Sequence, residues 1–144
     1  MNERRVRAHT TSLQELNDLR SVVARDLEDA AIEALSPDRR FATAYNAVLQ
    51  VTKMVLACAG YRVIGTGHQQ TTFEALELAM GTSVSSHTAY FDTCRRKRNI
   101  VDYDTANVAS RTEAEELLKE AKDFLQLAEA WIAQHHPQFK PAVP

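Results

Sequence analysis

The stretch PDRRFATAYNAVLQVTKMVLACA, residues 37–59, indicates the fold most clearly. Its apolar side chains recur at the three- and four-residue intervals of an α-helix, and Leu49 and Leu56 widen that face. The pattern predicts a helix from about Pro37 to Ala59. Because its apolar surface is wide, we expect it to pack on several sides, as a central helix does. The main face consists of Phe41, Ala44, Tyr45, Val48, Val51, Val55 and Ala59.

Periodic segments on both sides of this stretch predict four more helices. Glycine and proline are rare, with four of each, and they fall mainly between the periodic segments. Most connections are short, which makes neighbouring helices antiparallel. We therefore predict an all-α fold, an up-and-down bundle of four to five helices. The additional helices are expected at about 12–35, 72–80, 84–101 and 111–134.

Several helix starts are marked by a serine or threonine that is followed three positions later by glutamate. In this capping box the hydroxyl and the carboxylate each pair with a backbone N–H that otherwise lacks a partner. Ser36 before Pro37 marks another start, because proline at the first helical position removes no helical hydrogen bond. The boxes are Ser12 with Glu15, Thr71 with Glu74, and Ser110 with Glu113.

The length of 144 residues fits one domain, which we place at 1–144, with a core at about 12–135 and a frayed tail at 136–144. Hydrophobic residues make up 44% and charged residues 25%, as in soluble globular proteins. The formal net charge of −2 excludes a polycation. Nucleic-acid binding would therefore require a local basic patch.

The cysteines and the start of the chain predict a cytoplasmic protein. Cys58 and Cys94 lack the paired spacing of a zinc or CxxC motif, so we expect reduced, partly buried thiols. The start MNERRVRAHTTS has no apolar region of a secretory signal. No segment approaches the ~20 apolar residues of a membrane span, so no membrane partner is predicted.

The basic run in CRRKRNIVDYD, residues 94–104, is the main candidate for chemistry. Helical residues advance by about 100° each, so four successive cations cannot form one flat patch. Arg98 falls on an apolar stripe with Phe91, Cys94 and Val101, where a charge needs a partner such as Asp102.

Two interpretations of Arg98 stay open. It is either a salt-bridged arginine whose stem covers the core, or it lines a cleft or dimer seam and binds a phosphate through its planar fork. In the second case Arg95 shares that face and Asn99 orients a phosphate or ribose, whereas Arg96 and Lys97 point to solvent.

The loop GYRVIGTGHQQT, residues 60–71, has neither the GK[S/T] ending nor the preceding strand of a nucleotide-binding loop. We interpret it as a glycine helix stop and a flexible connector, from which Arg62 and His68 can still reach a ligand. His87 is expected to be packed or on the surface, and Tyr45 to be packed with its hydroxyl paired. Without an HExxH or ExxH motif, we predict no metal and no cofactor.

Three segments together resemble bacterial HEPN-domain proteins, the higher eukaryote and prokaryote nucleotide-binding family. They are RFATAYNAVLQVTKMVLACAGYRV (40–63), GHQQTTFEAL (67–76) and CRRKRNIVDYD (94–104). The resemblance spans about 38–104 and implies a bundle of four or five helices, usually a homodimer. Active members are metal-independent ribonucleases with an R-x(4–6)-H motif at a cleft between protomers. Many are toxins beside a minimal nucleotidyltransferase antitoxin, and others are non-catalytic binding modules.

Carried over by position, the motif arginine matches Arg98 and the following polar residue matches Asn99. The histidine is absent, because Tyr103, preceded by Asp102, stands five residues after Arg98. Tyrosine, with an ordinary pKa near 10, is a poor base, and pairing with Arg98 would lower the pKa of Asp102.

Three functions follow from these patterns. The first is a dimeric module that binds a nucleotide, RNA or a partner nucleotidyltransferase, with Arg95, Arg98, Asn99 and His68 as binding residues. The second is a metal-independent endoribonuclease that uses Arg98 and Asn99 with Asp102 or Tyr103. The third is a helical interaction protein without a nucleic-acid role. The absent histidine favours the first function.

Overall fold

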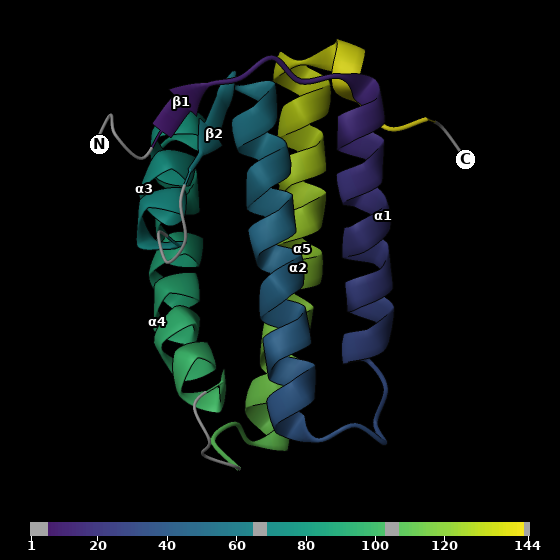
Figure 1. Ribbon diagram of the computed structural model, residues 1–144, viewed down its shortest axis with the longest axis vertical. Helices are drawn as coiled ribbons and strands as arrows, with labels where there is room; N and C mark the ends of the chain where they lie inside the picture. Colours follow the sequence, from purple (N-terminus) through teal and green to yellow (C-terminus); the bar gives the residue numbers. More distant parts are fainter. Residues whose placement is uncertain (1–5, 65–68, 103–106, 143–144) are drawn as a thin grey trace.

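The computed structural model describes residues 6–64, 69–102 and 107–142, apart from the side chain of Asp102. Five α-helices hold most of the described chain, and two short strands and two 3-10 turns complete it (Figure 1). The helices are α1 (Leu13–Ala30), α2 (Pro37–Cys58), α3 (Gln69–Met80), α4 (Ser85–Asp102) and α5 (Arg111–His135). The strands are β1 (Val6–Ala8) and β2 (Tyr61–Val63), and the turns are η1 (Thr82–Val84) and η2 (Pro137–Phe139).

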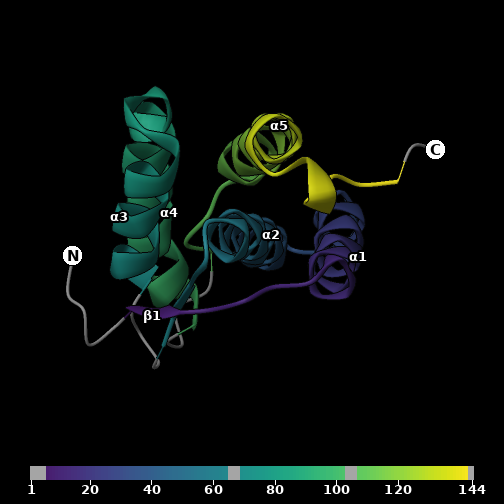
Figure 2. The ribbon, with the colours of Figure 1, turned by 90° about the horizontal axis from the view of Figure 1, so that it is seen from above.

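Helix α2 lies at the centre of the bundle. Seen from above, α1 and α5 flank it on one side, and the pair α3–α4 stands on the other (Figure 2). Helices α1 and α2 are antiparallel, and so are α4 and α5 (Figure 1). Helices α2 and α5, which are distant in the sequence, run in the same direction. The all-α bundle and its central helix are confirmed.

Aromatic side chains join the α3–α4 pair to the rest of the bundle. The ring of Phe91 on α4 lies 5.2 Å from Phe124 on α5 and 6.0 Å from Phe73 on α3. Phe73 in turn lies 6.3 Å from Tyr45 on α2, in an edge-to-face arrangement. His87 packs 6.2 Å from both Phe91 and Phe124, as expected for a packed histidine. These contacts fix α4 against two helices at once.

Two predicted helix boundaries are wrong. Helix α1 ends at Ala30 rather than near residue 35, because the buried Arg40 donates from Nε to the Ala30 carbonyl oxygen at 2.9 Å. This bond gives a partner to a carbonyl oxygen at the end of α1, which has none within the helix. Helix α3 begins at Gln69, so Thr71 is buried inside it and is not a cap. The boundary of α2 is confirmed to within one residue.

Serine caps hold the other helix starts. Ser110 and Glu113 form a complete capping box at α5. Ser12 and Ser36 each accept a bond from the backbone N–H three residues on, as predicted. At α1, however, the Glu15 carboxylate accepts hydrogen bonds from His9 and Thr11 instead of closing a box.

Two features at one end of the bundle were not predicted. Strands β1 and β2 pair in antiparallel register, Val6 with Val63 and Arg7 with Arg62, and form the β1–β2 ribbon. The predicted frayed tail is wrong for η2, because the Phe139 carbonyl oxygen accepts a bond from Arg20 at 2.6 Å. Residues 143–144 lie outside the described range. Of the helices in the described ranges, none combines the length and apolar character needed to cross a membrane.

Asp38 ties the start of α2 to the connection before α5. Its carboxylate oxygens accept hydrogen bonds from the backbone N–H groups of Asn107 (2.7 Å) and Ala109 (2.8 Å). Asn107 has a positive φ of 62°, a backbone conformation that asparagine tolerates better than most residues. Asp38 therefore holds a segment that local propensity alone would not fix.

We expect Asp38→Ala to lower the free energy of unfolding by about 2 kcal/mol, because it removes two hydrogen bonds to a charged acceptor. Urea denaturation measures this change. The control Asp123→Ala removes an exposed carboxylate whose one partner among the described residues is Lys119, and we expect a change within about 0.5 kcal/mol. Equal losses in the two variants would contradict this role of Asp38.

Candidate functional site

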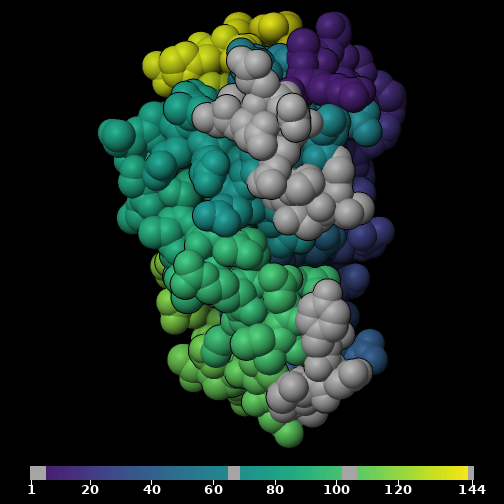
Figure 3. Space-filling model, turned by 60° about the vertical axis from the view of Figure 1, so that its left-hand side comes forward, coloured from purple at the N-terminus to yellow at the C-terminus, as the bar shows by residue number. Residues whose placement is uncertain are grey.

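The predicted basic site lies on α4, which with α3 forms the face turned forward in Figure 3. The charges of Arg95 and Arg98 both act on the phenol of Tyr45 on α2. Tyr45 is fully buried, and its hydroxyl donates to Gln69 Oε1 on α3 at 2.7 Å. Helices α2, α3 and α4 therefore meet at this point.

Burial controls the ionisation of Tyr45. Desolvation raises the pKa of Tyr45 well above its ordinary value of about 10, and the charges of Arg95 and Arg98 offset only part of that rise. The phenol therefore stays protonated at neutral pH. It can donate a hydrogen bond but cannot accept a proton from a substrate, so it is unsuited to act as a general base.

Asp92 forms ion pairs with Arg95 and Arg96, the two cations that come shortly before Arg98 on α4. Its carboxylate lies 2.8 Å from Arg95 Nε and 3.2 Å from Arg96 Nη2. The side chain of Arg95 is 21% exposed and that of Arg96 is 72% exposed. The prediction that Arg96 points to solvent is confirmed, whereas the side chain of Arg95 is mostly covered.

Arg98 lies on the apolar stripe that the sequence predicted. Phe91 and Cys94 of that stripe are buried, and Arg98 and Val101 are half-buried. Asn99, next to Arg98, is exposed. The side chain of Asp102 is outside the description, and so are His68 and Tyr103, so their proposed roles stay predictions.

The prediction that Lys97 points to solvent is wrong. Its ammonium group pairs with Glu113 of α5 and lies 3.5 Å from the Val108 carbonyl oxygen. The hydrogen bond from Lys97, with those from Ser110, lowers the pKa of Glu113. Lys97 thus joins α4 to the start of α5, and Arg95 and Arg98 remain as the cations of the run whose charges act on Tyr45.

A family model decides the classification of this fold and its basic helix. The model of the SAV_6107-like HEPN domain matches residues 31–129. The chain belongs to the HEPN family. HEPN domains are helical modules of a nucleotide-binding, ribonuclease-like kind. No match was found among curated proteins or among solved structures.

The segments that carry the HEPN resemblance meet in space. Residues 40–63 supply α2 and β2, residues 67–76 supply most of α3, and residues 94–104 supply the end of α4. Tyr45, Gln69 and Arg98 come from one segment each. The Tyr45 hydroxyl donates to Gln69, and the charge of Arg98 acts on the same phenol. The three segments of the resemblance are therefore neighbours in the fold.

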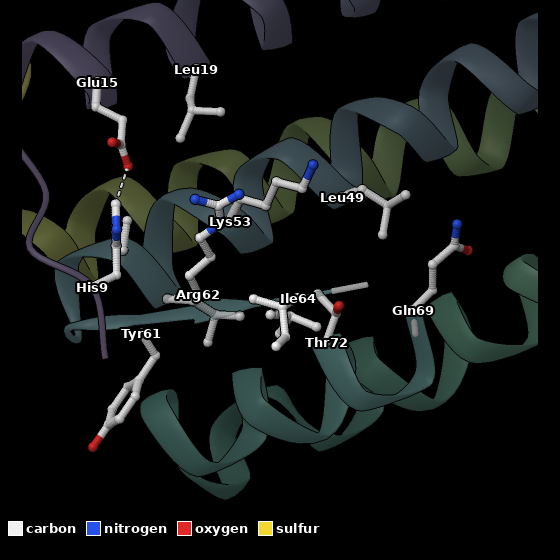
Figure 4. Close-up of a pocket in the computed structure, with 13 residues that line it drawn as sticks. His9, Glu15, Leu19, Leu49, Lys53, Tyr61, Arg62, Ile64, Gln69 and Thr72 are labelled. Carbon is white, nitrogen blue, oxygen red and sulfur yellow. Dashed lines mark hydrogen bonds and ion pairs between the residues drawn. The ribbon is translucent and has the colours of Figure 1, made fainter. Parts of the chain in front are cut away.

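A second feature, a cavity of about 570 Å³, opens between α1, α2, α3 and the β1–β2 ribbon (Figure 4). Arg62, which the sequence proposed as a ligand contact, reaches into it, and so does Lys53, which the sequence reasoning missed. The sequence did hold a signal for Lys53, because this cation lies between Leu49 and Leu56 on an otherwise apolar face of α2. Gln69 lines the cavity and also binds Tyr45, so the two features touch.

The remaining candidates do not add a reactive centre. Cys58 and Cys94 are free and buried, and burial raises the pKa of each thiol to about 11. Low-pKa, accessible thiols are the reactive ones, so both cysteines are suited to packing. Within the described ranges, no three His, Cys, Asp or Glu residues gather in a geometry for metal binding.

We expect Tyr45→Phe to lower the free energy of unfolding by about 1 kcal/mol near neutral pH, because Gln69 loses its hydrogen-bond donor. Above about pH 10 the unfolded chain ionises Tyr45 while the folded chain does not. The unfolded state then binds fewer protons, so the stability of the native protein falls as pH rises. The Phe variant should show a shallower fall in urea denaturation at pH 9 to 11.

The absorbance of tyrosinate gives an independent test of the same phenol. Tyr45→Phe should leave the absorbance change of the folded protein between about pH 9 and 11 unaltered, because the buried phenol does not ionise there. In protein unfolded by urea, where the phenol is no longer buried, Tyr45→Phe should reduce this absorbance change. A reduced change in the folded Tyr45→Phe variant would show that this phenol ionises readily.

Proposed function

We propose that this HEPN chain is a binding module whose α4 face, formed by Arg95, Arg98 and Asn99, holds the phosphate of a nucleotide or an RNA segment. The observation that carries the proposal is that Arg95, whose side chain is 21% exposed, and the half-buried Arg98 lie one helical turn apart on α4, and that the charges of both act on the buried Tyr45. Two guanidinium groups that are positioned by a packed helix suit phosphate binding, because each can donate parallel hydrogen bonds. The exposed Asn99 lies beside them and is available to a ribose or phosphate oxygen.

The chemistry around Arg98 favours binding over cleavage. Metal-free cleavage of RNA requires a group that accepts the 2′-hydroxyl proton near neutral pH. Tyr45 stays protonated, and His87, a histidine on α4 with Arg98, packs against Phe91 and Phe124. The ribonuclease hypothesis therefore rests on Asp102 and Tyr103, whose side chains are outside the description.

Dimerisation is part of the proposal. Ile100 is 51% exposed and lies directly after Asn99 on α4. The resemblance implies a cleft between two protomers beside Arg98, so a dimer would place two α4 faces at one seam and cover Ile100 there. A minimal nucleotidyltransferase partner and a cytoplasmic location stay predictions.

We expect Arg98→Ala to weaken binding of a fluorescein-labelled single-stranded RNA at least tenfold, because it removes a charged donor to phosphate. Fluorescence anisotropy in EDTA measures the affinity, and a parallel titration with adenosine triphosphate separates RNA from nucleotide. Arg96→Ala is the matched control on the same helix, and we expect less than a twofold change. The loss of RNA affinity that each substitution causes should be smaller at high salt, because phosphate contacts contribute less there.

Three outcomes of this experiment would overturn the binding proposal. Cleavage of the RNA by the native protein in EDTA, lost in Arg98→Ala, would establish the ribonuclease function instead. Equal weakening by Arg96→Ala and Arg98→Ala would reduce the effect to net charge. Absence of binding to both ligands at millimolar concentration would favour the interaction protein without a nucleic-acid role.

Sedimentation equilibrium at micromolar concentration should show a dimer of the native protein, and Ile100→Glu should shift it to monomer because a buried charge opposes association. The control Ile32→Glu places the same charge on another residue that is 45% exposed, after α1, and should leave the dimer intact. A native protein that sediments only as monomer would contradict the shared seam.

A further inference from the structure

We propose that the cavity between α1, α2, α3 and the β1–β2 ribbon is a second binding site, for a small organic anion. Its acidic group would lie between Lys53 and Arg62, and its apolar body would rest on Leu19, Leu49 and Ile64. This site is separate from the proposed phosphate face of α4 and does not depend on it.

The shape of the cavity suits a small molecule. Its volume of about 570 Å³ falls in the range of small-molecule sites. Three helices and strand β2 supply its walls, so it is part of the tertiary fold rather than a groove on one helix (Figure 4). Half-buried Leu19, Leu49 and Ile64 supply an apolar lining.

The charges in the cavity point to an anion. Most cations in the described residues form ion pairs, including Arg20, Arg40, Arg95 and Lys97. The side chains of Lys53 and Arg62 are exposed and, like those of Arg39 and Lys122, form no hydrogen bond or ion pair with the described part of the chain. Of these four, Lys53 and Arg62 line the cavity. Both point into the same cavity in Figure 4. Two unpaired cations that share a concave site raise the local concentration of anions.

The ribbon adds a third cation to the same face. Arg7 stands directly opposite Arg62 in the antiparallel register. Side chains directly opposite each other share one face of a ribbon, and like charges in that position are destabilising. No ion pair within the described residues neutralises Arg7. An anion bound at Arg62 would relieve this repulsion, which gives the ligand a stabilising effect on the ribbon.

The one carboxylate in the lining is already engaged. Glu15 Oε1 lies 2.8 Å from His9 Nε2 and 3.2 Å from Thr11 Oγ1. These bonds hold Glu15 on α1, directed to His9 rather than to Lys53 or Arg62 (Figure 4). The buried Thr72 and the amide of Gln69 complete the polar lining. The cavity therefore offers separate cationic and apolar parts, as a ligand with an acidic head and an apolar body requires.

Calorimetric titration with 1-naphthyl phosphate tests the proposal directly, because this probe joins an acidic head to a flat apolar body. We expect binding with a dissociation constant below millimolar, and neutral 1-naphthol to bind at least tenfold more weakly. A third titration, with 1-naphthoate, shows whether the site prefers a phosphate or a carboxylate head. Either preference supports an organic-anion site, whereas equal binding of 1-naphthol would overturn it.

A charge-matched pair of double variants locates the site. We expect Lys53→Gln with Arg62→Gln to weaken binding of 1-naphthyl phosphate at least tenfold, because both contacts to the anion are lost. The control Arg39→Gln with Lys122→Gln removes two exposed cations elsewhere and should change the affinity less than twofold. Circular dichroism confirms that both variants are folded. Equal weakening by the two pairs, or no binding by the native protein, would overturn the site.

The α4 face and the cavity are distinguished by one additional variant. Arg98→Ala should leave the affinity for 1-naphthyl phosphate within twofold of the native value, because Arg98 does not line the cavity. Amide shifts in NMR spectra should change at Lys53, Arg62 and Thr72 on titration. Loss of binding in Arg98→Ala, or shifts confined to α4, would place the probe on the α4 face and overturn a second site.

Discussion

The burial of most of α2 is the constraint on which the rest of the structure depends. Arg39 and Lys53 are exposed, but the polar side chains on the covered faces of α2 must find partners inside the protein, because an unpaired buried polar group is costly. Thr52 bonds the Val48 carbonyl oxygen, and Asn46 donates to the buried Asp26 at 2.6 Å. Arg40 donates to Ala30, and Tyr45 to Gln69. Each of these last three bonds also fixes the position of a neighbouring helix.

The bond between Tyr45 and Gln69 has the widest consequences. It positions the start of α3 and brings Gln69 to the edge of the cavity, while the charges of Arg95 and Arg98 of α4 act on the same phenol. The buried tyrosine thus lies between the basic face of α4 and the cavity beside the ribbon. Burial also keeps the phenol protonated, so this central residue contributes packing and a hydrogen bond rather than base chemistry.

Cations in this protein divide into structural ones and ones available to ligands. Arg20 pairs with Glu129 and the Phe139 carbonyl oxygen, and Lys97 pairs with Glu113, so both hold segments together. Lys53 and Arg62 have no such partners in the described residues and share one cavity. A basic run in the sequence is therefore a weak guide to function, because three of the four cations at 95–98 pair with carboxylates.

The sequence by itself determined the helices, their approximate bounds, the central role of α2, and the stripe that carries Arg98. These features depend on local periodicity and capping, which are written in neighbouring residues. It placed the ends of α1 and α3 wrongly, because Arg40 and Tyr45 act there from other helices. Only the tertiary structure decided which cations are paired, that residues 6–8 join residues 61–63, and that Lys53 and Arg62 share a cavity. Those outcomes depend on contacts between segments far apart in the chain, which no local pattern specifies.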